Sequence, residues 1–265
     1  MRCCLLILEG GDVVDETHKT NHQAEIDLIQ AGTLALVGSG EYLPRTDPLD
    51  RFLLAQLSAE PRVVCLPTAA GTEGDERINY WSKLGEEHFR RLGARVEALP
   101  VVDRASAEDE ALAQRIRAAN FVYLSGGKPD YLYRTLEGSP CWTAILSVLA
   151  VGGVVAGCSA GAMIFGERIA GFRSFQATQI GFNALHHGVI LPHFDEIPAA
   201  MAALAHSLLP KGLALVGIES STALVINRGQ MQVVGLKGVT LWTGRMKRRL
   251  TQSNPPFERL DEAPG

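Results

Sequence analysis

Short apolar runs alternate with segments of helical spacing between residues 33 and 158. Continuous apolar runs that end in Gly, Pro or Thr predict strands, and Ala, Leu and Ile at i, i+3 and i+4 predict helices. The predicted strands are 33–37, 62–67, 95–100, 121–125 and 150–156. The predicted helices are 47–58, 79–92, 108–118, 131–136 and 142–149. Such alternation predicts a mostly parallel central sheet with helices on both faces, a three-layer α/β sandwich.

The pattern changes after Ile169. The sequence predicts irregular loops or short strands from 171 to 190, a helix at 199–209, and closely spaced strands at 214–218, 223–226, 231–234 and 240–242. No linker interrupts the pattern, so one domain is expected over 31–250. Residues 1–30 are polar and lack periodicity beyond Leu8, which predicts a poorly defined N-terminal extension. Residues 251–265 are expected to form a flexible tail, and the basic cluster 245–249, short and near the end of the chain, is interpreted as solvated tail as well.

Composition narrows the function classes. The chain has 265 residues, 46% of them hydrophobic, and a net charge of −4, which argues against nucleic acid as a partner. No apolar run reaches the roughly 18 residues of a membrane helix, so no membrane partner and a cytoplasmic location are expected. The five cysteines lack paired CxxC spacing and are interpreted as reduced thiols. Gly38-Ser39-Gly40 lacks the third glycine of a dinucleotide fingerprint, so no cofactor and no metal are predicted.

The segment Gly157-Cys158-Ser159-Ala160-Gly161 carries the strongest chemical signal. It follows a predicted buried strand, and residues 160–165 indicate the start of a helix. Gly-x-Ser-x-Gly at a strand-to-helix turn is typical of a nucleophile elbow, which exposes one hydroxyl beside the helix's N-terminal amides. Ser159 is therefore the predicted nucleophile.

Four predicted turns lie at strand carboxyl ends, where ligands bind in open parallel sheets. They are 38–40, 68–70, 126–127 and the turn at Ser159. An oxyanion hole needs two backbone N–H groups aimed at one point. The Ala160 amide, directly after the nucleophile, and the Gly127 amide, at the end of another strand, are the predicted donors.

A serine nucleophile needs a base and a group that orients the base. His193 ends an extended apolar run and follows a proline, so it is the predicted base. His88 lies in a charged helical segment and is expected to be exposed. Glu219, at another strand end, is the predicted acid, although Asp195, Glu196 and Glu167 compete for this role.

The chain resembles peptidase family S51, the group of aspartyl dipeptidase and cyanophycinase, which has a flavodoxin-like fold of the class I glutamine amidotransferase type. Six segments in the same order carry the resemblance: 36–41, 67–70, 124–127, 157–162, 192–194 and 217–224. The resemblance implies that Ser159 is the nucleophile and His193 the base. The relatives' acidic positions fall near Ser174 and on Ser220, and their Gly-Gly-Asp-Gln is Gly126-Gly127-Lys128-Pro129 here.

The leading hypothesis is a serine-type peptidase that cleaves a small, Asp-containing peptide or isopeptide. The alternative is a silent binding module on the same fold, because a family acid is missing. A glutamine amidotransferase subunit needs cysteine at the elbow, where Cys158 is one residue early. An esterase of the α/β-hydrolase type needs a histidine after its acid, and no histidine follows His206. The sequence leaves the oligomeric state open, and a homodimer is one state it allows.

Overall fold

The computed structural model describes residues 31–171 and 176–263. The predicted N-terminal extension, 1–30, lies outside these residues. In the described part, the strands form two sheets, and the larger has seven strands. In spatial order they are β11 (Gln230–Gly235), β10 (Thr222–Asn227), β1 (Thr33–Val37), β5 (Val154–Cys158), β4 (Phe121–Leu124), β2 (Arg62–Leu66) and β3 (Arg95–Ala98).

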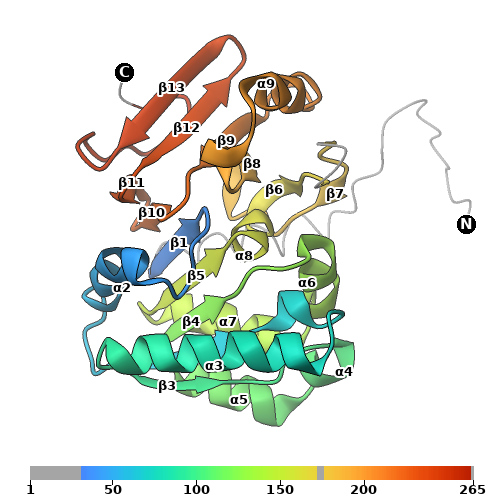
Figure 1. Ribbon diagram of the computed structural model, residues 1–265, viewed down its shortest axis with the longest axis vertical. Coiled ribbons are helices and arrows are strands. Elements are labelled where there is room, and N and C mark those ends of the chain that lie inside the picture. Colours follow the sequence, from blue (N-terminus) through green and yellow to red (C-terminus); the bar gives the residue numbers. More distant parts are fainter. Residues whose placement is uncertain (1–30, 172–175, 264–265) are drawn as a thin grey trace, which may run out of the picture.

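The five strands from β1 to β3 in this order run parallel, and β10 and β11 extend the sheet antiparallel. The helices are α2 (Asp47–Leu54), α3 (Asp75–Arg91), α4 (Arg104–Ala107), α5 (Glu110–Ala118), α6 (Pro129–Leu136), α7 (Pro140–Ala150), α8 (Ala160–Met163) and α9 (Ala199–Ser207). The longer helices α2, α3, α5 and α7 cover the two faces of the parallel sheet, with α3 in the lower part of the view, whereas α9 lies on the smaller sheet (Figure 1). The predicted three-layer α/β fold with a mostly parallel sheet is confirmed.

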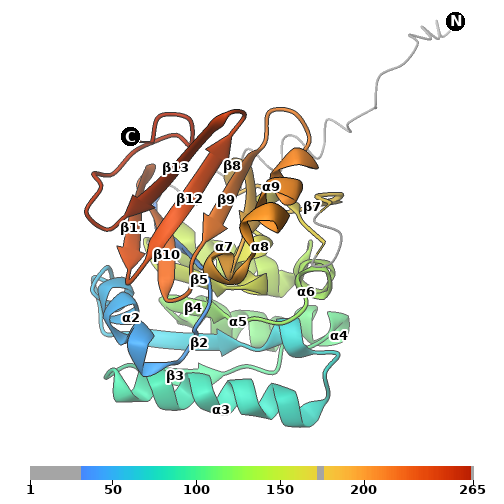
Figure 2. The same cartoon turned by 45° about the horizontal axis from the view of Figure 1, so that its top comes forward.

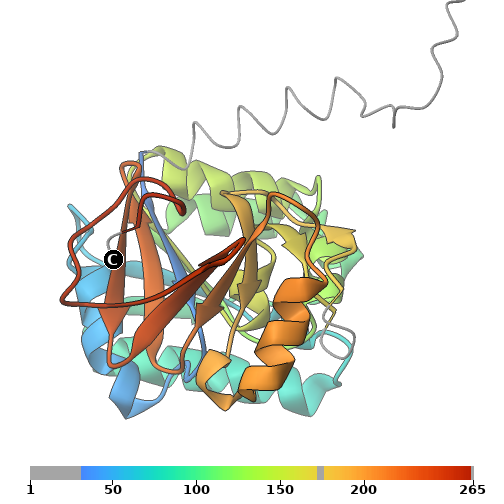
Figure 3. The ribbon, with the colours of Figure 1, turned by 90° about the horizontal axis from the view of Figure 1, so that it is seen from above.

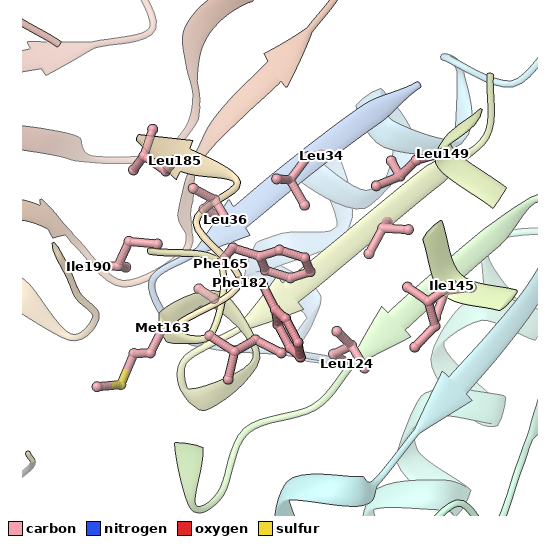
Figure 4. Packing of buried hydrophobic residues seen from close by; sticks show 14 of the residues in the cluster. Leu34, Leu36, Leu124, Ile145, Leu149, Met163, Phe165, Phe182, Leu185 and Ile190 are labelled. Atoms are coloured by element: carbon pink, nitrogen blue, oxygen red, sulfur yellow. The ribbon is translucent and has the colours of Figure 1, made fainter. Parts of the chain in front are cut away.

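Side-chain alternation along each central strand builds two separate cores. Leu34 and Leu36 of β1 face the side of α5 and α7, whereas Ala35 and Val37 face the side of α2 and α3. Every residue of β1 is buried. Successive side chains of a strand point to opposite faces, so a continuous apolar run fits a sheet covered on both sides. Figure 4 shows Leu34 and Leu36 among side chains of the first core.

The smaller sheet comes from the carboxyl-terminal part of the chain and lies above the parallel strands in Figure 2; Figure 3 shows it from above. Its six strands, again counted over the described residues, are β13 (Met246–Thr251), β12 (Gly238–Thr243), β9 (Ala214–Ile218), β8 (Leu185–Leu191), β6 (Gly166–Ile169) and β7 (Gln179–Ile180). Val216 and Ile218 of β9 join the core of the larger sheet, and Leu215 packs with α9 on the other face.

Two local expectations from the sequence were wrong. The basic cluster 245–249 is not a solvated tail, because β13 pairs with β12 over Met246–Thr251. His88 is not exposed: it is 3% exposed in α3, where its Nε2 lies 2.7 Å from Asp50 Oδ2. Both errors have the same cause. The local sequence of each segment is polar and suggests exposure to solvent, but a partner on another element packs the segment into the structure. Beyond residue 251, Phe257 is buried and pairs with Met231.

Candidate active site

Ser159 stands at a tight turn between β5 and α8. Its backbone has φ 52° and ψ −111°, a conformation that residues other than glycine rarely adopt. A Cβ at Gly157 would lie 2.1 Å from the Gly161 carbonyl oxygen, and a Cβ at Gly161 would lie 2.4 Å from the Leu124 carbonyl oxygen. The two glycines of Gly-x-Ser-x-Gly are therefore needed for backbone packing, which holds the serine in its strained conformation.

His193 reaches Ser159 from the smaller sheet. It follows β8, has a left-handed backbone at φ 52°, and places Nε2 3.2 Å from Ser159 Oγ. The next residue, Phe194, packs its ring on Gly217 of β9, where a Cβ would lie 2.4 Å from the ring. The structure thus brings together the predicted nucleophile and the predicted base, which are 34 residues apart in the chain.

Asp195 anchors the same loop. Its Oδ1 accepts hydrogen bonds from the Ser220 N–H at 2.7 Å and the Ser220 hydroxyl at 3.0 Å, and its Oδ2 pairs with Lys237. Partial burial opposes ionisation, but the Lys237 ammonium and the Ser220 donors outweigh it and lower the pKa of Asp195 to about 2. Asp195 is therefore a fixed anion that ties the His193 loop to the turn after β9.

Glu196 is the carboxylate beside His193. Its Oε2 lies 3.6 Å from His193 Nδ1, and its Oε1 accepts a hydrogen bond from Ser220 Oγ at 3.2 Å. The Glu196 side chain is 64% exposed, so solvent screens this pair. Ser220 occupies the position where the resemblance implies an acid, and here it holds a carboxylate from the neighbouring loop.

Glu219, the acid expected from the sequence, is not brought to His193. Its two oxygens accept from Arg249 at 2.6 Å each, and Oε2 also accepts from the Gly238 N–H at 3.1 Å. Glu219 is 7% exposed. Glu167, another competitor, lies 3.3 Å from His187. The sequence favoured Glu219 because it follows a strand. It did not predict β13, whose Arg249 binds the Glu219 carboxylate.

One predicted oxyanion donor, the Ala160 amide, directly follows Ser159, and the other, that of Gly127, follows a glycine that packs against Ser159. Ala160 is the first residue of α8, and the first N–H groups of a helix have no partner within it. Gly126 packs against the nucleophile: a Cβ built on it would lie 3.3 Å from Ser159 Cβ. Its N–H donates to Glu41 Oε1 at 3.1 Å, so the following amide, that of Gly127, is the one left in this turn for a ligand.

Cys158 is unsuited to act as the nucleophile. It is fully buried, and its thiol donates to Glu41 Oε2 at 3.0 Å. Burial, together with the neighbouring Glu41 carboxylate, raises the pKa of the Cys158 thiol well above its usual value. Because the thiolate is the reactive form, the raised pKa leaves this thiol a poor nucleophile.

Other features of the described residues lie away from this constellation. A hollow of about 740 Å³ is lined by the starts of β8 and β9, including His186 and His187, at the opposite end of β8 from His193. No group of three or more His, Cys, Asp or Glu side chains in the described ranges could hold a metal ion. Among the helices of these ranges, none is long and apolar enough to cross a membrane.

Comparisons with known proteins agree with this architecture. The model of peptidase family S51 matches residues 34–234. The chain is 26% identical over 143 residues to the uncharacterized peptidase Lmo0363 of Listeria monocytogenes, covering 51% of this chain and 67% of that protein. It is 26% identical over 240 residues to a cyanophycinase of Synechococcus elongatus, covering 86% of this chain and 72% of that protein.

Two solved structures are similar as well. A crystal structure of a peptidase from an acI-B1 Actinobacterium matches with a TM-score of 0.78 and 35% identity, covering 86% of this chain and 97% of that one. A putative peptidase E protein from Listeria monocytogenes EGD-e, with a TM-score of 0.53 and 20% identity over 83% of this chain and 99% of that one, shares the fold. The chain therefore belongs to peptidase family S51, and this membership supports a peptidase or hydrolase role.

Proposed function

We propose that this protein is a serine-type peptidase that cleaves a small peptide or isopeptide through an acyl-enzyme. One observation carries the proposal: Ser159 Oγ lies 3.2 Å from His193 Nε2, on a strained turn between β5 and α8 that leaves the serine half-buried. A serine hydroxyl is a weak nucleophile alone, and an imidazole within hydrogen-bond reach is what activates it.

In the proposed reaction, Ser159 Oγ attacks the scissile carbonyl carbon and His193 Nε2 takes the hydroxyl proton. The carbonyl oxygen becomes an oxyanion, which the Ala160 and Gly127 amides stabilise. The C–N bond then breaks, and His193 gives its proton to the leaving amine. Water, deprotonated by His193, attacks the acyl-enzyme and releases Ser159 with its proton restored.

For the group that orients His193, we propose Glu196 instead of Glu219. Glu196 Oε2 faces Nδ1, the nitrogen opposite the one near Ser159, as a triad requires. The carboxylate of Glu219 is already bound by Arg249 and Gly238, which suits a role in holding β9 to β12 and β13. At 3.6 Å and largely exposed, Glu196 is expected to contribute less than a buried triad acid does.

The proposed substrate carries a carboxylate, as in an Asp-containing dipeptide. Lys128 directly follows the Gly127 amide, and its Nζ donates to Thr72 Oγ1 at 2.8 Å. With Arg134 it lines a hollow of about 310 Å³. Asp130 lines the same hollow, so the proposal relies on Lys128, which follows the turn of the Gly127 amide and has no ion pair within 4 Å among the described residues.

Labelling by a fluorophosphonate probe, mapped by mass spectrometry, tests the nucleophile. We expect labelling at Ser159 that is lost in Ser159→Ala and strongly slowed in His193→Ala. His206→Ala is the matched control, because His206 stacks on Trp242 with ring centroids 4.3 Å apart, away from Ser159. Turnover is then compared on dipeptides that begin with Asp, isoAsp or a neutral residue.

The second candidate, a silent binding module on the same fold, is favoured by the long and exposed contact between Glu196 and His193. It predicts that a folded sample binds acidic dipeptides without cleaving them and is not labelled at Ser159. That pair of results would refute the peptidase proposal.

A further inference from the structure

Glu41 connects the two turns that carry the oxyanion donors. It lies in the loop after β1, and its side chain crosses to the ends of two other strands. Glu41 Oε1 accepts the Gly126 N–H at 3.1 Å, and Oε2 accepts the Cys158 S–H at 3.0 Å. These partners are 85 and 117 residues away in the chain, so a single carboxylate bridges segments that the sheet brings together.

The Gly126 contact determines which amide of that turn is available. Because the carboxylate takes the Gly126 N–H, the peptide plane before Gly126 is fixed, and the next N–H, from Gly127, is directed elsewhere. A carboxylate oxygen hydrogen-bonded to a backbone N–H is a strong, directional acceptor. Glu41 thereby sets the direction of the donor that the proposed mechanism uses.

The Cys158 contact acts on the other turn. Cys158 is the last residue of β5, and Ser159 follows it directly. Its thiol is held in the core shared with α2 and α3, whereas Ser159 contacts His193 from the smaller sheet. Fixing the thiol at the strand end therefore constrains the start of the turn that presents Ser159 and the Ala160 amide.

The Glu41 carboxylate and Ser159 are both packed closely against Gly126. A Cβ at Gly126 would lie 2.7 Å from Glu41 Oε1 and 3.3 Å from Ser159 Cβ, so carboxylate and nucleophile crowd the same glycine. A negative charge this close disfavours an oxyanion, because like charges repel. The charge of Glu41 therefore opposes the proposed reaction, and its geometric effect is what the site can use.

We infer that Glu41 is a positioning residue: it holds the Gly127 and Ala160 amides in the orientation that stabilises the oxyanion. This inference rests on the proposed function. A 1 Å misplacement of reacting groups can cost about 100-fold in rate, which sets the expected effect of losing the bridge.

The test compares Glu41→Gln, Cys158→Ala and Cys158→Ser with the unchanged protein. The readouts are kcat and KM on the dipeptide that is cleaved best, the second-order rate of fluorophosphonate labelling, and the melting temperature. Glutamine keeps the size of Glu41, and its remaining oxygen can still accept the Gly126 N–H, so the hydrogen bond with Cys158 is the one that is lost. We expect kcat and the labelling rate to fall about tenfold with KM unchanged, which is part of the loss for a full misplacement.

The cysteine pair isolates the second contact. Cys158→Ala removes the donor and is expected to slow labelling about tenfold, which is part of the loss for a full misplacement. Cys158→Ser restores a donor and is expected to recover most of the rate. This pair also decides the question if Glu41→Gln does not fold.

Three results would overturn the inference. A folded Glu41→Gln variant with unchanged kcat shows that the bridge does not aim the donors, and one with a raised kcat shows that only the charge of Glu41 matters. Equal labelling rates in Cys158→Ala and Cys158→Ser would show that the hydrogen bond between residue 158 and Glu41 does not position the amides. Activity that persists in Ser159→Ala refutes the proposed function itself, so the two failures are distinguishable.

Discussion

Among the histidines that contact carboxylates, His193 and His88 have surroundings that give them different roles. The His193 side chain is 39% exposed, its Nδ1 lies 3.6 Å from Glu196 Oε2, and its Nε2 faces the hydroxyl of Ser159. The His88 side chain is 1% exposed and lies 2.7 Å from an equally buried Asp50. The shorter contact is thus the one in the core. The comparison teaches that a close His–carboxylate pair indicates a catalytic site only where a nucleophile and an opening to solvent accompany it.

The buried pair is part of an aromatic core. The His88 ring centroid lies 5.7 Å from that of Tyr42 and 5.0 Å from that of Phe89. Burial raises the pKa of Asp50, partly offset by the hydrogen bond with His88. Asp50 Oδ1 has no hydrogen-bond partner among the described residues. Such a pair needs both partners, because removing one leaves the other buried and unsatisfied.

The largest expected effect separates the two histidines by activity. His193→Ala is expected to lower kcat by about 10⁴-fold or more, because it removes the base that activates Ser159. His88→Ala is expected to leave kcat of the folded fraction unchanged. The expected difference is tested by measuring peptide hydrolysis by both variants, with the folded fraction of each determined by circular dichroism. Equal losses of activity in the two folded variants would contradict the comparison.

Stability should show the reverse order. His88→Ala is expected to lower the free energy of unfolding by about 3 kcal/mol or more, because it leaves the Asp50 carboxyl buried without its partner. His193→Ala, at a half-exposed position, is expected to change it by less than about 1 kcal/mol. Urea denaturation of both variants checks this. A small change in His88→Ala would mean that water or a local shift readily replaces the buried pair.

The two glutamates near the site sharpen the comparison. Glu196→Gln is expected to lower kcat by about tenfold, less than for a buried triad acid, because solvent screens an exposed pair. Glu219→Gln is expected to leave kcat unchanged and to cost about 1–2 kcal/mol of stability, because it weakens charge-assisted bonds to Arg249. Kinetics and denaturation of both variants decide the assignment. A larger loss of kcat in Glu219→Gln would return the acid's role to Glu219.

The smallest effect concerns the Asp195 anchor of the His193 loop. Its folded pKa of about 2 lies below the ordinary value of 3.8, so the carboxylate is stabilised by folding. This contribution is complete above about pH 4 and is lost as the pH falls toward 2. Asp195→Asn should therefore show a flatter decline of melting temperature between pH 4 and pH 2. If the melting temperature of Asp195→Asn fell with pH as steeply as that of the unchanged protein, Asp195 would make no contribution to the acid sensitivity of the fold.

Local pattern was enough for the parallel part of the fold. β1 matches the predicted range at both ends, and β2 and β4 begin at the predicted residues, because each is an apolar run between turn residues. The smaller sheet was harder to predict. β13, Met-Lys-Arg-Arg-Leu-Thr, has too many charges to read as a strand, and its place depends on pairing with β12 and on Glu219.

In the candidate site, too, some residues could be predicted from local sequence and others could not. Gly-x-Ser-x-Gly after an apolar strand and a histidine after a Pro-ended run marked Ser159 and His193, since both signals are local. The partner of His193 depends on a contact between the turn after β9 and the loop after β8, which no local pattern describes. From the sequence, Glu196 and Glu219 were both candidates for the acid. In the structure Arg249 binds Glu219, whereas Glu196 faces His193.

By itself, the sequence determined the parallel α/β framework, the turn that presents Ser159 and the side chain of His193, because strand periodicity and turn chemistry are properties of short segments. The tertiary structure alone decided that Glu196 faces His193, that Glu41 bridges two turns, and that His88 is buried with Asp50. Glu41 and His88 meet partners distant in sequence, and Glu196, only three residues from His193, is held by Ser220 of the turn after β9. The energy of such contacts depends on burial and on the partner, neither of which a single segment specifies.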